Sequence, residues 1–249
     1  MPASGAITPG PPVGLNQQTS VVQQGLHKHS PISSSATNLP TPANTQSKAF
    51  IEAASKGHLD VVKLLAGHRK VDINAQDADG RTALTRACWG SYIEVVKFLL
   101  SYQGNPPVNA NVVTKTGSTA LTLAAEKGDP DVVKALLAHP GLNVNYARED
   151  GHTALTFAAT WGKAEVVKLL LQHPSNPPID INARTKLKLT PLMKASMNGH
   201  IEVVKVLLAH NGNSPLDVEA TDQDGWTALT HAASKGHADV VALLLEHMD

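Results

Sequence analysis

A pair of adjacent valines recurs along most of this chain, and this recurrence constrains its fold more than any other feature. The pairs begin at Val61, Val95, Val132, Val166, Val203 and Val240. A threonine lies thirteen residues before each pair except the first, where Lys48 stands; these are Thr82, Thr119, Thr153, Thr190 and Thr227. Successive threonines are 37, 34, 37 and 37 residues apart. Such a period predicts stacked copies of one small supersecondary unit.

Each copy of the unit predicts two short helices separated by a stop. In the copy that covers residues 148–183, Thr153 is placed to cap the first helix, and Gly162 supplies a left-handed residue after it. A second, apolar helix is predicted from Glu165 to His173. Helices this short cannot bury their apolar faces alone, so neighbouring copies must complete the core.

A leucine pair follows every valine pair, and together they form an apolar stripe that we expect to join copy to copy. Its members are Leu64-Leu65, Leu99-Leu100, Leu136-Leu137, Leu169-Leu170, Leu207-Leu208 and Leu243-Leu244. The stop between the helices departs from the pattern once. Ser91 stands where the other copies have glycine, and Gly90 precedes it. The sequence therefore predicts a shifted turn in the second copy.

The motifs of these copies resemble those of ankyrin repeats. The pattern Asp-x-x-Gly-x-Thr-Ala-Leu-Thr-x-Ala occurs at 77–87 and 222–232. Further matches are Thr190-Pro191-Leu192, the turns Gly57-His58, Gly199-His200 and Gly236-His237, and the endings Asp72-Ile73-Asn74 and Asp180-Ile181-Asn182. The chain is thus identified as a member of the ankyrin-repeat family. The resemblance implies an all-α solenoid of stacked helix-turn-helix units with projecting β-hairpin finger loops.

Two regions follow from the repeat pattern. The ankyrin-repeat domain is expected at 47–249, with repeats one to six at about 47–76, 77–113, 114–147, 148–183, 184–220 and 221–249. Residues 1–46 are rich in Ser, Thr, Pro and Gln, and Lys28 is their only charged residue apart from histidine. This composition predicts a disordered segment. It is either a solvated tail or the export signal of a bacterial effector that engages a host protein.

The composition excludes several classes of function. The 21 basic and 21 acidic residues cancel, so no overall attraction to nucleic acid or to an anionic membrane is expected. No apolar run approaches the roughly 18 residues of a membrane span, and no secretory signal is evident. The lone Cys88 cannot form an internal disulfide. We expect a cytoplasmic protein, or alternatively one secreted into a host cell.

Recurring ionisable residues do not indicate a catalytic, cofactor or metal site. Histidines end most of the second helices, at His68, His139, His173, His210 and His247. Packed helices lie about 8–10 Å apart, too far for one histidine per layer to share a zinc ion with bonds of about 2 Å. The repeated lysines each have an acidic residue three positions earlier, which indicates a solvated face. Cys88 aligns with buried alanines. We therefore predict no enzyme activity and no cofactor.

The remaining candidates are positions where the copies differ. The resemblance implies that partner proteins contact the finger tips and the concave face of the first helices. The matching residues are Arg86, Trp89, Lys127, His152, Phe157, Trp161, Lys186, Leu187, Lys188, Leu189, Lys194, Met197 and Trp226. Aromatic residues and arginine are enriched in binding hot spots. The sequence thus predicts a non-enzymatic protein–protein interaction module.

Repeat five and repeat six carry two further hypotheses. In repeat five, Lys186 and Lys188 stand beside Leu187, Leu189, Met193 and Met197, so we expect a partner segment with acidic and apolar residues. Repeat six keeps apolar residues such as Leu245 near the end of the sequence. A monomer is expected, with two alternatives open: a longer native chain, or an end-to-end dimer through the C-terminal repeat.

Overall fold

The computed structural model describes residues 44–175, 177–212 and 214–248, and these residues form twelve helices and no β-strand. The helices are α1 (Thr45–Ser55), α2 (Leu59–Ala66), α3 (Ala83–Trp89), α4 (Ile93–Leu100), α5 (Ala120–Lys127), α6 (Pro130–Leu137), α7 (Ala154–Thr160), α8 (Ala164–Gln172), α9 (Pro191–Met197), α10 (Ile201–Leu208), α11 (Ala228–Lys235) and α12 (Ala238–Met248). Each repeat contributes one helix pair. The region predicted to be disordered lies, except for residues 44–46, outside the described residues.

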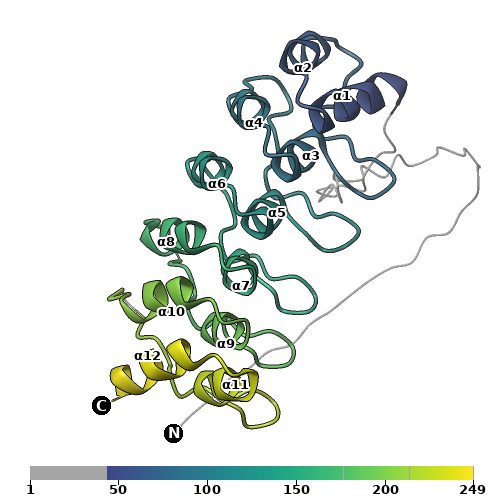
Figure 1. Cartoon of the computed structure of the whole chain (residues 1–249). Coiled ribbons are helices and arrows are strands. Elements are labelled where there is room, and N and C mark those ends of the chain that lie inside the picture. Colours follow the sequence, from purple (N-terminus) through teal and green to yellow (C-terminus); the bar gives the residue numbers. More distant parts are fainter. Residues whose placement is uncertain (1–43, 176, 213, 249) are drawn as a thin grey trace, which may run out of the picture. The chain divides into compact units, whose positions relative to one another are not determined.

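The helix pairs stack in two layers. The first helices, α1, α3, α5, α7, α9 and α11, pack in succession, and the second helices form a parallel row beside them (Figure 1). A loop projects from the first-helix layer between successive repeats (Figure 1). The all-α solenoid expected from the sequence is confirmed.

Threonine caps begin the first helices as the sequence predicted. In α7, Thr153 Oγ1 accepts a hydrogen bond from the Thr156 N–H at 3.3 Å, and Thr156 Oγ1 accepts one from the Thr153 N–H at 2.7 Å. The same reciprocal arrangement caps α3, α5 and α11. Helix α1 instead begins under Asn44, whose Oδ1 accepts the Ser47 N–H at 2.8 Å. This first helix therefore starts two residues before the expected boundary at 47.

The turn of repeat two is not shifted, and that prediction was wrong. Ser91 itself adopts the left-handed conformation, with φ of 56°, in register with glycines such as Gly57 at 74°. Gly90 has an ordinary φ of −79°, so the turn itself does not require a glycine there. A Cβ on Gly90 would lie 2.2 Å from Cε2 of Tyr92, so the tyrosine ring needs the space that glycine leaves.

The core runs between the layers along the valine and leucine stripe. Leu136 and Leu170 are fully buried, as are both valines of the pair in repeat three. The outer repeats differ, because a layer covers only one of their sides. In α2, Val61 is 45% exposed and Leu64 is 77% exposed, while Leu245 of α12 is 48% exposed. The predicted stripe is therefore complete only inside the stack.

Asparagine side chains join each repeat to the next. Asn145 Nδ2 donates to the Pro178 carbonyl at 2.7 Å, and its Oδ1 accepts the Asp180 N–H at 3.1 Å. Asn74, Asn111 and Asn182 make the same pair of bonds to the backbone of the following repeat. Each bridge satisfies two backbone groups and fixes the spacing of adjacent loops.

Histidine and tyrosine rings make further bonds between repeats. The Nε2 atoms of His173 and His200 lie 2.9 Å from the carbonyls of Leu137 and Thr160, which end helices of the preceding repeat. A carbonyl only accepts, so Nε2 carries the proton in both rings. Tyr102, which replaces the terminal histidine in repeat two, donates its hydroxyl to Ala66 O at 3.1 Å. These rings form hydrogen bonds to carbonyls left unpaired at helix ends, rather than hold a metal ion.

We predict that truncating a buried leucine of the stripe strongly destabilises the stack. Leu136→Ala or Leu170→Ala should lower the free energy of unfolding by about 2–5 kcal/mol, because each leaves a cavity between layers. Leu64→Ala is the matched control, since its exposed side chain should cost far less. Urea denaturation followed by circular dichroism measures all three. Equal losses for Leu64→Ala and Leu136→Ala would contradict the assigned core.

The asparagine bridges give a second prediction for stability. Asn145→Ala removes both bonds to repeat four and should cost about 1–3 kcal/mol, the value of two net hydrogen bonds. Asn143→Ala changes an exposed asparagine two residues away and serves as the control. A loss no larger for Asn145→Ala than for Asn143→Ala, measured in the same urea titration, would show that the bridge does not stabilise the stack.

Candidate functional site: concave face and finger loops

Five-residue loops, here called fingers, project from repeats two to six and begin at Asp77, Thr114, Arg148, Thr185 and Asp222. In each finger the N–H of the first residue donates to the carbonyl of the fifth, as from Thr185 to Leu189 at 3.1 Å. The sequence suggested β-hairpins, but no strand is formed in residues 44–248 as far as they are described. The fingers are tight loops, each closed by this bond.

Neighbouring fingers are held side by side by backbone bonds. The Lys115 N–H donates to Asp79 O at 2.9 Å, and the Lys186 N–H donates to Asp150 O at the same distance. The Gln223 N–H bonds to Leu187 O at 3.2 Å. Side chains at successive finger tips therefore form an ordered row.

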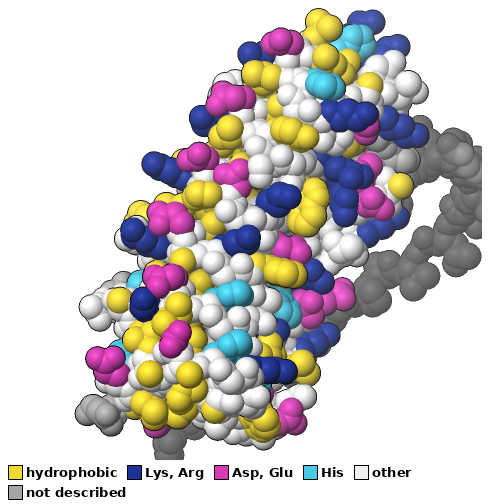
Figure 2. Space-filling view, viewed as in Figure 1, with side chains coloured by type: hydrophobic (Ala, Val, Ile, Leu, Met, Phe, Trp, Pro, Cys, Tyr) yellow, Lys and Arg dark blue, Asp and Glu magenta, His cyan; other side chains and the backbone are white. Residues whose placement is uncertain are grey.

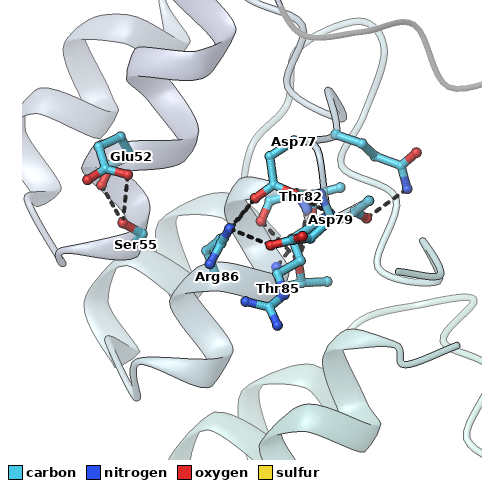
Figure 3. Close-up of polar contacts among 10 residues, drawn as sticks. Glu52, Ser55, Asp77, Asp79, Thr82, Thr85 and Arg86 are labelled. Carbon is cyan, nitrogen blue, oxygen red and sulfur yellow. Dashed lines mark hydrogen bonds and ion pairs between the residues drawn. The ribbon is translucent and has the colours of Figure 1, made fainter. Parts of the chain in front are cut away.

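In repeat two, Arg86 is tied to its own finger (Figure 3). Its Nε donates to Asp77 Oδ2 at 2.8 Å, and its Nη2 lies 3.4 Å from Asp79 Oδ2. Burial alone would raise the pKa of Asp77, but the N–H groups of Arg81 and Asp79 and the Arg86 guanidinium outweigh it and lower the pKa. The positive charge of Arg86, a predicted binding residue, is thus largely paired with acidic residues of its own finger.

Repeat six uses the same pair of positions with different residues. His231 Nε2 lies 2.8 Å from Asp222 Oδ2, and the His231 ring lies 5.3 Å from the Trp226 ring, centroid to centroid. Burial again opposes ionisation of Asp222, but hydrogen bonds from Trp226, His231 and Asp224 lower its pKa. Trp226 is 43% exposed because the described residues hold no seventh layer to cover it.

Repeat four brings two of its functional candidates and two charged neighbours into one cluster. Arg148 Nη2 lies 3.1 Å from Asp150 Oδ2, and His152 Nδ1 lies 3.2 Å from Asp150 Oδ1. The Phe157 ring lies 5.2 Å from the His152 ring and 5.4 Å from Arg148 Cζ. The sequence selected His152 and Phe157 separately, and the fold places them in contact.

Lys194 of α9 adds a charge to this cluster from the next layer. Lys194 lies four positions after the residue that caps α9, and Phe157 lies four positions after Thr153, which caps α7. Lys194 and Phe157 therefore occupy equivalent positions on adjacent helices. Burial lowers the pKa of Lys194, although Asp150 opposes the shift. Burial also lowers the pKa of His152; Asp150 opposes this change, while Lys194 and Arg148 add to it. His152 is therefore mostly neutral at pH 7.

Two tryptophans lie exposed at the C-terminal ends of first helices. Trp89 is 44% exposed, and Lys127 of the next repeat lies over its ring, with Nζ 5.6 Å from the centroid. Trp161 is 54% exposed and follows Phe157 by one helical turn. Burying such rings against a partner would gain more than burying most other side chains.

The predicted apolar tip of repeat five is smaller than expected. Leu187 is 51% exposed, and Lys186 and Lys188 are exposed beside it. Leu189 is only 7% exposed and Met193 only 1%, so neither offers a surface to a partner and their inclusion was wrong. The reason is structural: the finger closes over Leu189, and Met193 lies in the first turn of α9, facing the core. Met197 is partly buried.

The second helices carry paired charges, as the sequence indicated. Lys97 and Glu94 lie 3.1 Å apart, and Lys205 and Glu202 lie 2.7 Å apart, each pair at i,i+3. Figure 2 shows acidic and basic side chains alternating down the left edge, over the second-helix layer. In the face turned to the reader, basic and apolar side chains are interspersed over the first helices (Figure 2).

Cys88 has no features of a nucleophile. It is fully buried in α3, and burial raises the pKa of its thiol far above the usual range. In the described part of the chain, no three His, Cys, Asp or Glu side chains gather as metal ligands would.

None of the described helices is both long and apolar enough to span a lipid bilayer.

The stacked helix pairs, the fingers and the variable concave face define a repeat protein with an extended binding surface. Family models for ankyrin repeats match residues 50–100, 106–185 and 177–249. The chain belongs to the ankyrin-repeat family. Ankyrin repeats are a protein–protein interaction module.

Solved ankyrin structures share the fold. The ankyrin repeat domain of Bcl-3, a member of the IkappaB protein family, is 27% identical, with a TM-score of 0.69 over 83% of this chain and 87% of that one. The ankyrin repeat protein EF0377 is 24% identical, with a TM-score of 0.70 over 80% of this chain and 98% of that one. The likeness to EF0377 concerns the fold alone.

Curated relatives match shorter segments. A probable E3 ubiquitin-protein ligase, XBOS33 of Oryza sativa subsp. japonica, is 42% identical over 86 residues, which is 34% of this chain and 16% of that protein. Short transient receptor potential channel 3 of Rattus norvegicus is 33% identical over 97 residues, 39% of this chain and 10% of the channel. The chain spans a small fraction of these relatives, so what they share with it is the repeat.

The Asp77–Arg86 pair predicts a defined pH dependence. Because the folded pKa of Asp77 is depressed, its stabilisation is complete well above the unfolded value of about 3.9 and is lost as pH falls through the folded pKa. Asp77→Asn should lower the free energy of unfolding by roughly 0.5–2 kcal/mol at pH 7. The difference from wild type should shrink below about pH 4. A constant difference from pH 7 to pH 3 in urea titrations would contradict this pairing.

Proposed function

We propose that this protein is a non-enzymatic interaction module that binds a partner protein through the concave face and finger tips of repeats two to five. The observation that carries the proposal is the exposure of Trp89 and Trp161 at the C-terminal ends of α3 and α7, in the same row of first helices. Large aromatic rings left in water at internal repeats are unfavourable unless a partner covers them. Both stand where other repeats carry smaller or polar residues.

The charges of this surface support the same conclusion. Lys127 lies beside Trp89, and Lys186 and Lys188 flank the exposed Leu187 at the tip of the fourth finger. On the second helices, lysines such as Lys97 are paired with acids of their own helix. Exposed aromatic, apolar and basic side chains on one face suit a protein segment that carries acidic and apolar residues.

The module is proposed to act by binding alone. The one cysteine is buried, and the histidines at helix ends bond to backbone carbonyls of the preceding repeat. The clusters around Asp77, Asp150 and Asp222 each hold a finger. Export of the chain into a host cell was an alternative that rested on residues 1–46, which lie almost wholly outside the described residues, so no structural observation favours it.

We predict that Trp161→Ala weakens partner capture without unfolding the protein. The immobilised full chain, exposed to an extract of its native cells and cross-linked, should retain proteins that are lost on Trp161→Ala. Removing an interface tryptophan typically costs at least about 2 kcal/mol of binding, roughly a thirtyfold loss of affinity. The melting temperature should change little, because the side chain is mostly exposed.

The matched control is Leu64→Ala, which removes an exposed apolar side chain from a second helix. It should retain the same proteins as wild type. Capture that survives Trp161→Ala but fails with Leu64→Ala would move the binding surface to the convex end of the stack and contradict the proposal.

A further inference from the structure

The cluster of repeat four and Lys194 of repeat five form a cationic patch whose charges are unequally matched. Arg148 and His152 both approach the single carboxylate of Asp150, at 3.1 and 3.2 Å. Lys194 enters from α9 and forms no ion pair within 4.0 Å among the described residues. Two permanent cations and one ionisable imidazole therefore share one acid.

The patch is also partly shielded from water. The side chains of Arg148 and His152 are 26% and 21% exposed, and Lys194 is partly buried. The apolar Phe157 ring lies against both Arg148 and His152. A cation held against an aromatic ring away from bulk water attracts an anion more strongly than a fully solvated lysine does.

Trp161 is the C-cap residue of α7 and follows Phe157 by four residues. Its exposed indole and the cationic patch therefore present two different contacts about one helical turn apart, roughly 5 Å. A single peptide segment can reach both with neighbouring side chains.

Building on the proposed function, we infer that this cationic patch binds a carboxylate side chain of the partner. The carboxylate ion-pairs with Lys194, and an adjacent apolar side chain packs on Trp161. Asp150 holds Arg148 and His152 in place rather than neutralising Lys194. This assigns acid recognition to the concave face between repeats four and five, in addition to the basic finger tip at Lys186.

The test uses random 12-residue peptides displayed on phage and selected on the full chain. Wild type should enrich peptides with Asp or Glu at one position next to an aromatic or aliphatic residue. Lys194→Gln should lose the acidic preference and bind the selected peptide roughly tenfold more weakly. Lys194→Arg should restore binding. Lys168→Gln on α8 makes the same charge change on the convex side and should bind like wild type.

The outcomes separate this inference from the function on which it rests. Enriched peptides that lose affinity with Trp161→Ala but show no acidic preference would overturn the carboxylate site and leave the interaction module intact. Equal affinity of Lys194→Gln and wild type for an acidic peptide would overturn it as well. A wild-type chain that enriches no peptide over bare resin would contradict both.

A second readout follows from His152, which faces Arg148 and Asp150 of its own finger and Lys194 of α9. Burial lowers its pKa, so it is neutral at pH 7.5 and gains a positive charge only at more acidic pH. A selected peptide that contains Glu and no His should therefore bind more tightly as the pH is lowered from 7.5 toward about 5, where its Glu is still ionised. His152→Gln should abolish the difference. The same pH dependence in that variant would remove His152 from the site.

Discussion

The structure depends on hydrogen bonds that one repeat makes to the backbone of the next. Asn145 illustrates them, because its amide satisfies an N–H and a carbonyl of repeat four with a single side chain. His173 and His200 each bond to a carbonyl at a helix end of the repeat before them. Such directional bonds fix the register of the layers, which the apolar stripe alone would not.

Once the layers are fixed, each finger is free to differ in chemistry. The first residue of a finger and the fourth residue after the helix cap face each other in repeat after repeat, but the pair changes. It is Asp77 with Arg86 in repeat two, Arg148 with Phe157 in repeat four, and Asp222 with His231 in repeat six. A constant backbone therefore presents a different side-chain contact in each layer, which is how a solenoid acquires specificity.

Much of this architecture could be predicted from the sequence, because caps and stops act within a few residues. Thr153 caps α7 and Gly162 ends the turn through bonds inside their own repeat. The asparagine bridges could not be foreseen, since the role of Asn145 depends on where the backbone of repeat four lies. The prediction for Leu189 failed for the same reason: the finger that covers it is visible only in three dimensions. The cationic patch that includes Lys194 likewise requires two layers placed side by side.

The central claim is that partners bind over Trp89 and Trp161. The chain contains three tryptophans, so the indole N–H signals in a nitrogen–proton NMR spectrum number three and can be assigned by single substitutions. Titration with a phage-selected peptide should shift the signals of Trp89 and Trp161 in proportion to occupancy. The Trp226 signal, from repeat six, should stay in place and serve as an internal reference. Binding that leaves Trp89 and Trp161 unshifted would contradict the account.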